Sequence, residues 1–344
     1  MQHEITESSN LLDSAGRLVQ CGWARQPLLT YNPENLAFYR LRALQFLRLK
    51  EWDYYAVFTP RYFVAMAVAN LGYADNVFAY LLDFEQPWMH EESLLIPLAR
   101  GVSLPHDSQL GDVHFDNGTV HMEFRVEDGG RRLVINWPNF HTGAGLTADI
   151  QLRLPPRHES VVMATPIGER RFYYNRKLNC LPASGWLRYA GQTYSLDPTQ
   201  CLGGLDWGRG VWEYRSFWNW ASASAYLPDG RSLGLNLGEG FGDLTAASEN
   251  AFILDGCVHK LDQVPFVYNP SDYMQPWCFV SSDGALDLTF TPFYERVARS
   301  NVLIISSEVH QMFGHYSGRL RTAGGEQIEV RDLLGFAEEH HARW

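Results

Sequence analysis

The chain has 344 residues, 46% of them hydrophobic, so it is long enough to bury a sizeable core in two domains or in one large β architecture. Its formal net charge of −11 argues against nucleic acid or an anionic membrane as the main partner, because both attract basic surfaces.

The N-terminal segment carries no sign of export. Residues 1–10, MQHEITESSN, lack both the basic and the apolar region of a secretory signal. No apolar window approaches the roughly 20 residues of a membrane-spanning helix. The cysteines are scattered and odd in number, which is typical of reduced thiols. We therefore expect a cytoplasmic protein without a membrane span.

Helix-forming sequence is sparse. Asn32-Pro33 precedes an apolar run and offers an N-cap and a first-turn proline, which predicts one helix near 33–48. Residues 333–341, LLGFAEEHH, allow a second, short helix.

Hairpin turns are the dominant pattern. Asx-Gly and Gly-Gly pairs recur between strand-like runs, and they favour tight turns because these residues tolerate positive φ at low cost. The pairs are Asn117-Gly118, Asp128-Gly129, Asp229-Gly230, Asp255-Gly256, Asp283-Gly284 and Gly324-Gly325. Hairpin following hairpin predicts a mostly β fold of antiparallel meanders or barrels with few short helices.

Prolines interrupt the strand pattern between residues 155 and 190. Pro155-Pro156 and the Pro-Ala-Ser-Gly stretch from Pro182 lie there, and a new hairpin follows. We therefore expect two β domains of similar size, 1–180 and 181–344, the second carrying the main motif.

The turn of the hairpin at 216–240 decides its register. Leu-Pro-Asp-Gly is typical of a type I turn with Gly230 in the left-handed position of a bulge. In that register Leu227 pairs with Arg231.

This register predicts two unlike faces. One carries alanines and leucines, as a core requires. The other carries Trp218, Trp220 and Asn236 among serines and glycines, which is typical of a cavity wall. A solvent face with scattered aromatic residues is the alternative.

Asp206, in the run GLDWGRGVWEY (204–214), is the first candidate for acid–base catalysis. Burial against Trp207 would raise the pKa of its carboxyl group, and Arg209 would lower it. Such tuning suits a general acid or base. The alternative is a buried Asp–Arg pair that braces a glycine-rich loop.

Two further pairs are candidates. Glu308 and His310 alternate in a strand-like run, so they point the same way and could share a proton, or else form a polar surface pair. Glu249 and Asn250 follow a glycine-rich run and would contribute an acid and an amide to a binding site, or else cap a loop.

The motifs of cofactor and metal sites are missing. GEGFGD (238–243) lacks the spacing and the helix of a dinucleotide site. His90-Glu91-Glu92 and His340-His341 lack metal-ligand spacing. We therefore expect no cofactor and no metal.

Several runs resemble one known family. They are GLDWGRGVWEYRSFWNWASA, DGRSLGLNL, SENAFILDG, HQMFGHYSG and LLGFAEEHHARW, all within 186–344. These runs are similar to a bacterial family of unknown function that is grouped with the lipocalin-like AttH and carotenoid 1,2-hydratase proteins. The resemblance implies two lipocalin-like β-barrel or sandwich domains with a cavity as the functional centre, and it implies no particular substrate.

We hypothesise a cofactor-independent enzyme that uses acid–base chemistry on a small, partly apolar molecule, by hydration, elimination, isomerisation or cyclisation. Asp206 would be the acid–base, Arg209 its tuner or an anion anchor, and Trp218 and Trp220 the cavity wall. One alternative is a non-catalytic protein that binds a lipid or isoprenoid. Another is a carbohydrate-active enzyme, which a second carboxylate near Asp206 would favour.

Overall fold

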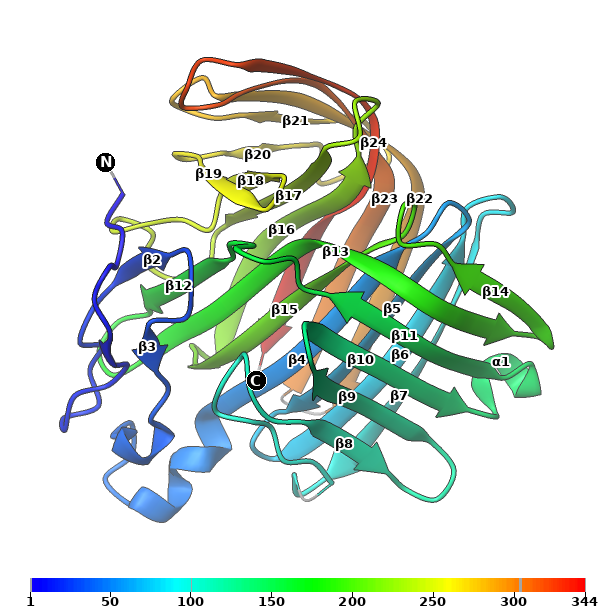
Figure 1. Cartoon of the computed structure of the whole chain (residues 1–344). Helices are drawn as coiled ribbons and strands as arrows, with labels where there is room; N and C mark the ends of the chain where they lie inside the picture. Colours follow the sequence, from blue (N-terminus) through cyan, green and yellow to red (C-terminus); the bar gives the residue numbers. More distant parts are fainter. Residues whose placement is uncertain (1, 100, 303–304, 344) are drawn as a thin grey trace.

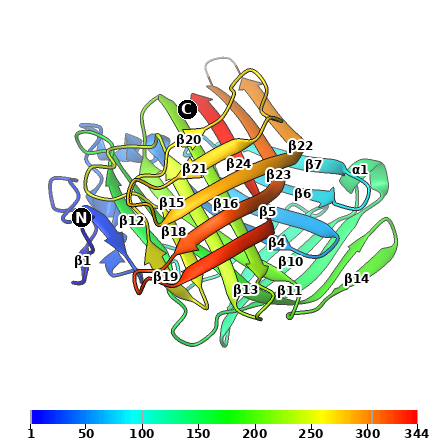
Figure 2. The ribbon, with the colours of Figure 1, turned by 90° about the horizontal axis from the view of Figure 1, so that it is seen from above.

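The computed structural model describes residues 2–99, 101–302 and 305–343. Nearly all regular structure is antiparallel strand, arranged in two curled sheets that each form a half-barrel (Figures 1 and 2). This arrangement confirms the predicted mostly β, lipocalin-like fold class. No helix in the described ranges is long and apolar enough to cross a bilayer.

The first sheet has 13 strands and holds most of the chain up to residue 211. Its main path runs β7-β6-β5-β4-β15-β13-β11-β10-β9-β8, while β12 and β14 pair with β13, and β2 pairs with β12. The path strands are β4 (Leu49–Phe58), β5 (Tyr62–Asn70), β6 (Ala74–Asp83), β7 (Trp88–Pro97), β8 (Val113–Asp116), β9 (His121–Glu127), β10 (Gly130–Trp137), β11 (Leu146–Arg153), β13 (Phe172–Tyr189) and β15 (Leu202–Val211). The attached strands are β2 (Gly22–Ala24), β12 (Val161–Pro166) and β14 (Gln192–Leu196). A separate pair joins β1 (Ser9–Asn10) to β3 (Leu29–Thr30).

The second sheet has nine strands in the order β19-β18-β17-β16-β24-β23-β22-β21-β20. They are β16 (Arg215–Tyr226), β17 (Ser232–Glu239), β18 (Ala251–Leu254), β19 (Cys257–Lys260), β20 (Phe266–Val267), β21 (Trp277–Val280), β22 (Leu286–Val302), β23 (Ile305–Arg321) and β24 (Gln327–Arg343). All six predicted turns join neighbouring strands of one sheet.

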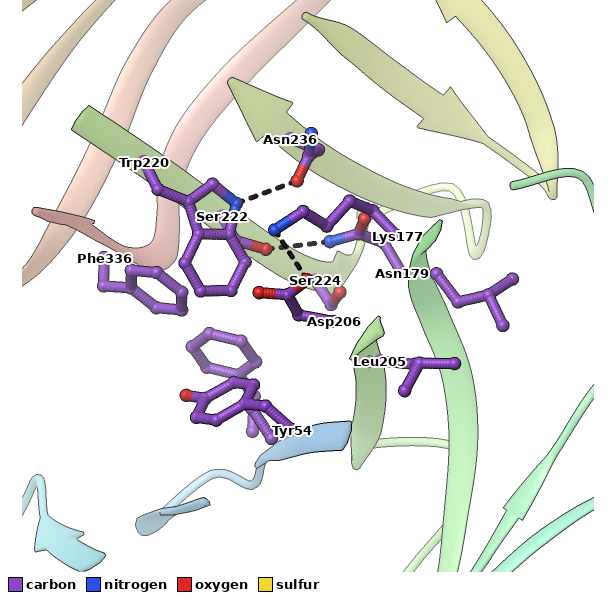
Figure 3. A pocket seen from close by; sticks show the side chains of 14 residues that line it. Tyr54, Lys177, Asn179, Leu205, Asp206, Trp220, Ser222, Ser224, Asn236 and Phe336 are labelled. Carbon is purple, nitrogen blue, oxygen red and sulfur yellow. Dashed lines mark hydrogen bonds and ion pairs between the residues drawn. The ribbon is translucent and has the colours of Figure 1, made fainter. Parts of the chain in front are cut away.

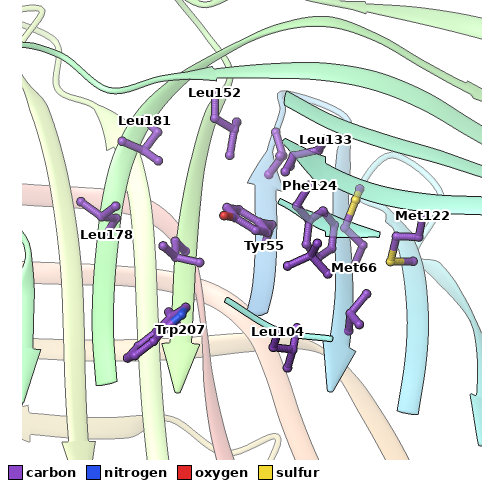
Figure 4. Packing of buried hydrophobic residues seen from close by; sticks show 14 of the residues in the cluster. Tyr55, Met66, Leu104, Met122, Phe124, Leu133, Leu152, Leu178, Leu181 and Trp207 are labelled. Carbon is purple, nitrogen blue, oxygen red and sulfur yellow. The ribbon is translucent and has the colours of Figure 1, made fainter. Parts of the chain in front are cut away.

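Apolar side chains fill three layers. One cluster, with Tyr55, Phe124 and Trp207, lies inside the first half-barrel (Figure 4). A second, with Trp277 and Tyr316, lies inside the second half-barrel. A third packs the outer side of β4–β6 against β23 and β24, so the two half-barrels are joined by an apolar layer of their own.

The predicted register of the β16–β17 hairpin is confirmed. The amide of Leu227 donates to the carbonyl of Arg231 at 2.7 Å, and Gly230 has a φ of +88°. Ser222 therefore pairs with Asn236, whereas the alanines of β16 and the leucines of β17 face the core of the second half-barrel.

The predicted helix near 33–48 is wrong. The structure has two 3₁₀ segments there, η1 (Pro33–Asn35) and η2 (Arg42–Arg48). The side chain of Asn32 does not cap a helix, because its amide group exchanges two hydrogen bonds with the backbone of Leu12. Leu41 and Phe46 remain exposed, so no packed apolar face holds a longer helix together.

The short helix at 333–341 is also wrong, since these residues lie in β24. β24 lies between β16 and β23, and both of its faces are largely buried along this stretch. Its sequence therefore lacks the alternation of apolar and polar residues that is typical of a strand with one face in solvent. The only α-helical turn described is α1 (Phe140–Gly143).

The domain boundary at 180 stays a prediction. Residue 180 lies inside β13, and β15 still belongs to the first sheet, between β4 and β13. The two sheets divide between Val211 and Arg215. All five cysteines are unpaired, and the cytoplasmic location stays a prediction as well.

Candidate active site

A small pocket lies in the layer between the two half-barrels. Strand β4 contributes Tyr54, β13 Lys177, β15 Asp206, β16 Trp220 and β24 Phe336 (Figure 3). Strands of both sheets therefore contribute to one site, and its residues come from widely separated parts of the sequence.

Alternation along β15 aims Asp206 into this pocket. Gly204 and Asp206 face the second sheet, whereas Leu205 and Trp207 belong to the core of the first half-barrel. A Cβ on Gly204 would lie 2.7 Å from the carbonyl oxygen of Leu178. The glycine is therefore needed for the close approach of β13.

Asp206 forms an ion pair with Lys177 on the neighbouring strand. The Lys177 Nζ lies 2.8 Å from Asp206 Oδ1, and the two side chains are only 5% and 10% exposed. The ammonium group also lies 4.0 Å from the centre of the Trp220 ring, so it makes a cation–π contact. Attraction between opposite charges is strong where water is excluded, so burial strengthens the interaction between the two groups.

A second carboxylate approaches the same ammonium group. Glu249 Oε2 lies 3.8 Å from Lys177 Nζ. Asn236 holds the glutamate in place by donating to its carbonyl oxygen at 2.9 Å, and accepts a hydrogen bond from the Trp220 indole at 2.9 Å. Asn236, a predicted cavity-wall residue, thus positions both Glu249 and the ring of Trp220, the second predicted wall residue.

Glu338 of β24 is a functional candidate that the sequence analysis missed. It pairs with Trp220 in the β-ladder and is 6% exposed. Burial raises its pKa to about 7, although the positive charges of Arg296 and Lys177 oppose the shift. Gln311 donates a hydrogen bond to its Oε2 at 3.0 Å. A carboxyl group of this pKa is able both to give and to take a proton near neutrality.

The hydroxyl group of Tyr54 is oriented by a chain of hydrogen bonds. Tyr80 donates to the amide oxygen of Gln311 at 3.0 Å, so its hydroxyl oxygen is left to accept from Tyr54 at 2.8 Å. The proton of Tyr54 therefore points toward Tyr80. The Tyr54 oxygen keeps a lone pair that is able to accept a further hydrogen bond, and the Tyr54 side chain lines the pocket.

The structure separates Trp207 and Arg209 from Asp206. Both side chains turn to the opposite face of β15, where Arg209 lies 2.8 Å from Asp53 Oδ1 and 4.2 Å from the Trp207 ring. The predicted contact between Asp206 and Arg209 is therefore wrong, because neighbours of opposite parity on a strand point to opposite faces. Lys177 takes the place that Arg209 was expected to fill.

Trp218 lies at the margin of the site. Its indole hydrogen-bonds to Glu338, and its ring lies 3.9 Å from that of His340. It also packs against Phe241, in an aromatic group beside the pocket. Burial lowers the pKa of His340 to about 3, so this imidazole is neutral at physiological pH.

The remaining candidates lie elsewhere. Glu308 and His310 do face the same way, with 3.1 Å between Glu308 Oε1 and His310 Nε2. Their further partners are Arg299 and Glu295 on β22, and none of these side chains lines the pocket. Asn250 accepts a hydrogen bond from the amide of Gly238 and donates to Asp262, as the loop-cap alternative expected.

The free volume of the pocket is about 20 Å³, room for about one water molecule. Any larger ligand must displace side chains, and the large ones that line the pocket are Tyr54, Phe58, Trp220 and Phe336. In the described part of the chain, no three metal-ligating side chains converge at this pocket. The pocket offers a paired carboxylate and ammonium and an aromatic wall. Glu338, whose carboxyl group has a pKa of about 7, does not line the pocket itself but neighbours the lining residue Trp220 in the β-ladder.

The curled antiparallel sheets and the pocket between them define a lipocalin-like β protein. The sequence matches the family described as a domain of unknown function, DUF2804, over residues 2–344, and the chain belongs to that family. No curated protein sequence matches the chain at a significant level.

Kievitone hydratase and an AttH-like protein are among the solved structures that resemble the chain. Kievitone hydratase from Nectria haematococca has a TM-score of 0.50 at 13% identity, with 86% of this chain and 88% of that chain covered. An AttH-like protein from Nitrosomonas europaea has a TM-score of 0.47 at 15% identity, with coverage of 85% and 92%. The match to DUF2804 confirms the inferred membership of a family of unknown function, and at these identities the likeness to the solved structures concerns the fold alone.

Proposed function

We propose that the chain is a cofactor-independent enzyme that uses acid–base chemistry on a small, partly apolar molecule bound between the half-barrels. One observation carries the proposal, namely the buried ion pair of Lys177 and Asp206 against the Trp220 ring. Buried charges are costly, and active sites are where such groups gather. Hydration, elimination, isomerisation and cyclisation all need one group to take a proton and another to return it.

The side chains divide these roles. Asp206, which lies 2.8 Å from the Lys177 ammonium group, takes a proton from the substrate or from a water molecule. Glu338, with its pKa of about 7, returns one. Trp220 and Phe336 pack against the apolar part of the substrate, and the Tyr54 oxygen accepts a hydrogen bond from it. The fold is shared with a protein named as a hydratase, which supports hydration as one member of this set.

A carbohydrate-active enzyme is the second candidate, because Glu249 supplies a second carboxylate beside Asp206. Both approach the same ammonium group, at 2.8 Å and 3.8 Å. Glycoside hydrolysis uses two such carboxyl groups flanking one bond. A sugar ring, however, needs far more room than the pocket offers as it stands, so the smaller and more apolar substrate is favoured. A lipid carrier is favoured least, because its cavity would be apolar throughout.

The test is exchange of substrate protons with solvent. The protein is incubated in D₂O with a panel of enolisable ketones and carbonyl-conjugated alkenes, and mass spectrometry records deuterium incorporation and addition of water. Asp206→Asn keeps the size of the side chain and removes the titrating group, so the rate should fall about 10²–10⁴-fold.

Asp287→Asn, the same change at an exposed position of β22, is the matched control and should keep the full rate. A folded Asp206→Asn variant with undiminished exchange would remove Asp206 from the mechanism. Binding without exchange by the wild type would favour a carrier, and release of sugar from a glycoside panel would favour the second candidate.

A further inference from the structure

Four metal-ligating side chains lie on one face of the β8–β9 hairpin, at an edge of the first sheet. His114 and Asp116 alternate on β8, and His121 and Glu123 alternate on β9. His114 pairs with Glu123 and Asp116 with His121 in the β-ladder, so the four side chains form a square. β8 is the last strand of the first sheet, and β13, β11, β10 and β9 separate it from β15. None of the four residues lines the pocket between the half-barrels.

Three of these side chains converge closely. One ligand atom each from His114, Asp116 and His121 lies within 4.8 Å of the other two. The rings of His114 and His121 are 5.2 Å apart, and His121 Nδ1 lies 3.1 Å from Asp116 Oδ2. The other ring nitrogen of His121 is 3.7 Å from Glu123 Oε2. Small rotamer changes bring such atoms to the spacing of ligands around one ion.

The hairpin holds these groups firmly. The alternate residues of both strands, among them Phe115 and Met122, are buried in the core of the first half-barrel. The amide of Gly118 donates to Asp116 Oδ1 at 2.7 Å, which leaves Oδ2 directed at His121.

We propose that His114, Asp116 and His121 bind a Zn²⁺ ion at the surface of this hairpin, with water completing the coordination. Two imidazoles and a carboxylate are a donor set that suits zinc, whereas calcium and magnesium prefer oxygen ligands alone. The ion replaces the hydrogen bond between His121 and Asp116. It joins β8, which has only four residues, to β9, and so fastens the exposed edge of the sheet.

Direct titration tests the site. Tag-free protein, stripped with a chelator, is titrated with ZnCl₂ in competition with a chromophoric chelator. The wild type should bind one equivalent that His114→Ala and His121→Ala each weaken at least tenfold, since even the removal of an outer partner of a metal ligand costs about 10–100-fold in affinity. Zinc should raise the thermal unfolding midpoint of the wild type and not that of the double variant.

His90→Ala is the control, because His90 also contacts a carboxylate, at 2.8 Å from Glu92, in another part of the sheet. It should leave the one-equivalent binding unchanged. Equal zinc affinity in the wild type and in the folded His114→Ala/His121→Ala variant would overturn the proposal. So would a loss of binding in the His90→Ala variant.

Discussion

Lys177 and Asp206 depend on each other, because each is a buried charge with the other as its nearest counter-charge. Removing one partner of a buried ion pair leaves an uncompensated charge. We therefore expect Lys177→Met to lower the free energy of unfolding by about 3–5 kcal/mol. Lys177→Met/Asp206→Leu, which removes both charges, should recover most of that loss. Urea denaturation followed by tryptophan fluorescence measures both values.

An exposed pair provides the contrast. Arg299 and Glu308 are also 2.8 Å apart, but their side chains are 57% and 45% exposed. Solvent screens such a pair, so Arg299→Met should cost only about 0–1 kcal/mol. Equal losses for Lys177→Met and Arg299→Met would show that burial of the Lys177–Asp206 pair does not increase its contribution to stability.

Glu338 makes stability depend on pH. Its pKa is about 7 in the folded chain and about 4.3 in an unfolded one, so between these values the folded state holds a proton that the unfolded state has lost. The contribution is therefore complete below about pH 4.3 and is lost as the pH rises through 7. Glu338→Gln mimics the protonated group and should gain stability over the wild type between pH 5 and pH 8.

Urea midpoints of the wild type and the Glu338→Gln variant at pH 5, 6, 7 and 8 check this expectation. The difference between the two proteins isolates Glu338 from every other titrating group. A difference that stays constant over this range would mean that Glu338 keeps an ordinary pKa.

At the scale of elements, a β-bulge in β13, between Leu178 and Leu181, and the β16–β17 hairpin join the two sheets. Asn179 donates to Ser222 Oγ at 2.9 Å, and the amide of Cys180 donates to Ser224 Oγ at 3.1 Å. Gly234 leaves the necessary room, since a Cβ there would lie 2.6 Å from the Asn179 Cβ. Gly234→Ala should therefore push the bulge away and cost about 1–3 kcal/mol, as overpacking does.

Hydrogen exchange distinguishes this effect from a general loss of stability. Gly234→Ala should lower the protection of the Cys180 amide more than that of the hairpin itself. Gly230→Ala is the control, since no atom lies within 4 Å of its Cβ position and only its positive φ opposes the change. If Gly230→Ala exposes the Cys180 amide equally, Gly234 has no special part in joining the sheets.

Local turn chemistry explains why the elements of this fold could be predicted. Each Asx-Gly pair specifies a hairpin by itself, and Pro228 before Asp229-Gly230 was enough to predict the register that places Trp220 and Asn236 on one face. The helix near 33–48 failed because Asn32 is used by Leu12, a contact that no local pattern reveals.

The site itself depends on pairings between distant strands. Asp206 was predicted as a site residue because its segment is rich in tryptophan. Lys177 and Glu338 carry no such signal, since each becomes a site residue only when β13 and β24 lie next to β15 and β16. The spacing His-x-Asp and His-x-Glu on β8 and β9 is visible in the sequence, but only the register brings the two halves together.

At the scale of the whole molecule, the order of the strands along the chain does not match their division between the two sheets at residue 180. β15 lies between β4 and β13 in the middle of the first sheet, although it follows residue 180. A break at 180 would cut β13 and separate β15 from the rest of its sheet. A break at 213, in the exposed link before β16, leaves both sheets whole.

We therefore expect fragments 1–213 and 214–344, produced together, to associate into a native-like complex, because the apolar layer between the sheets draws them together. Fragments 1–180 and 181–344 should fail to associate, since the first lacks a central strand. Copurification through a tag on one fragment and the β signal in circular dichroism measure the outcome. Efficient association of the second pair alone would instead support the boundary at 180 and would make β15 an element that docks after its sheet has formed.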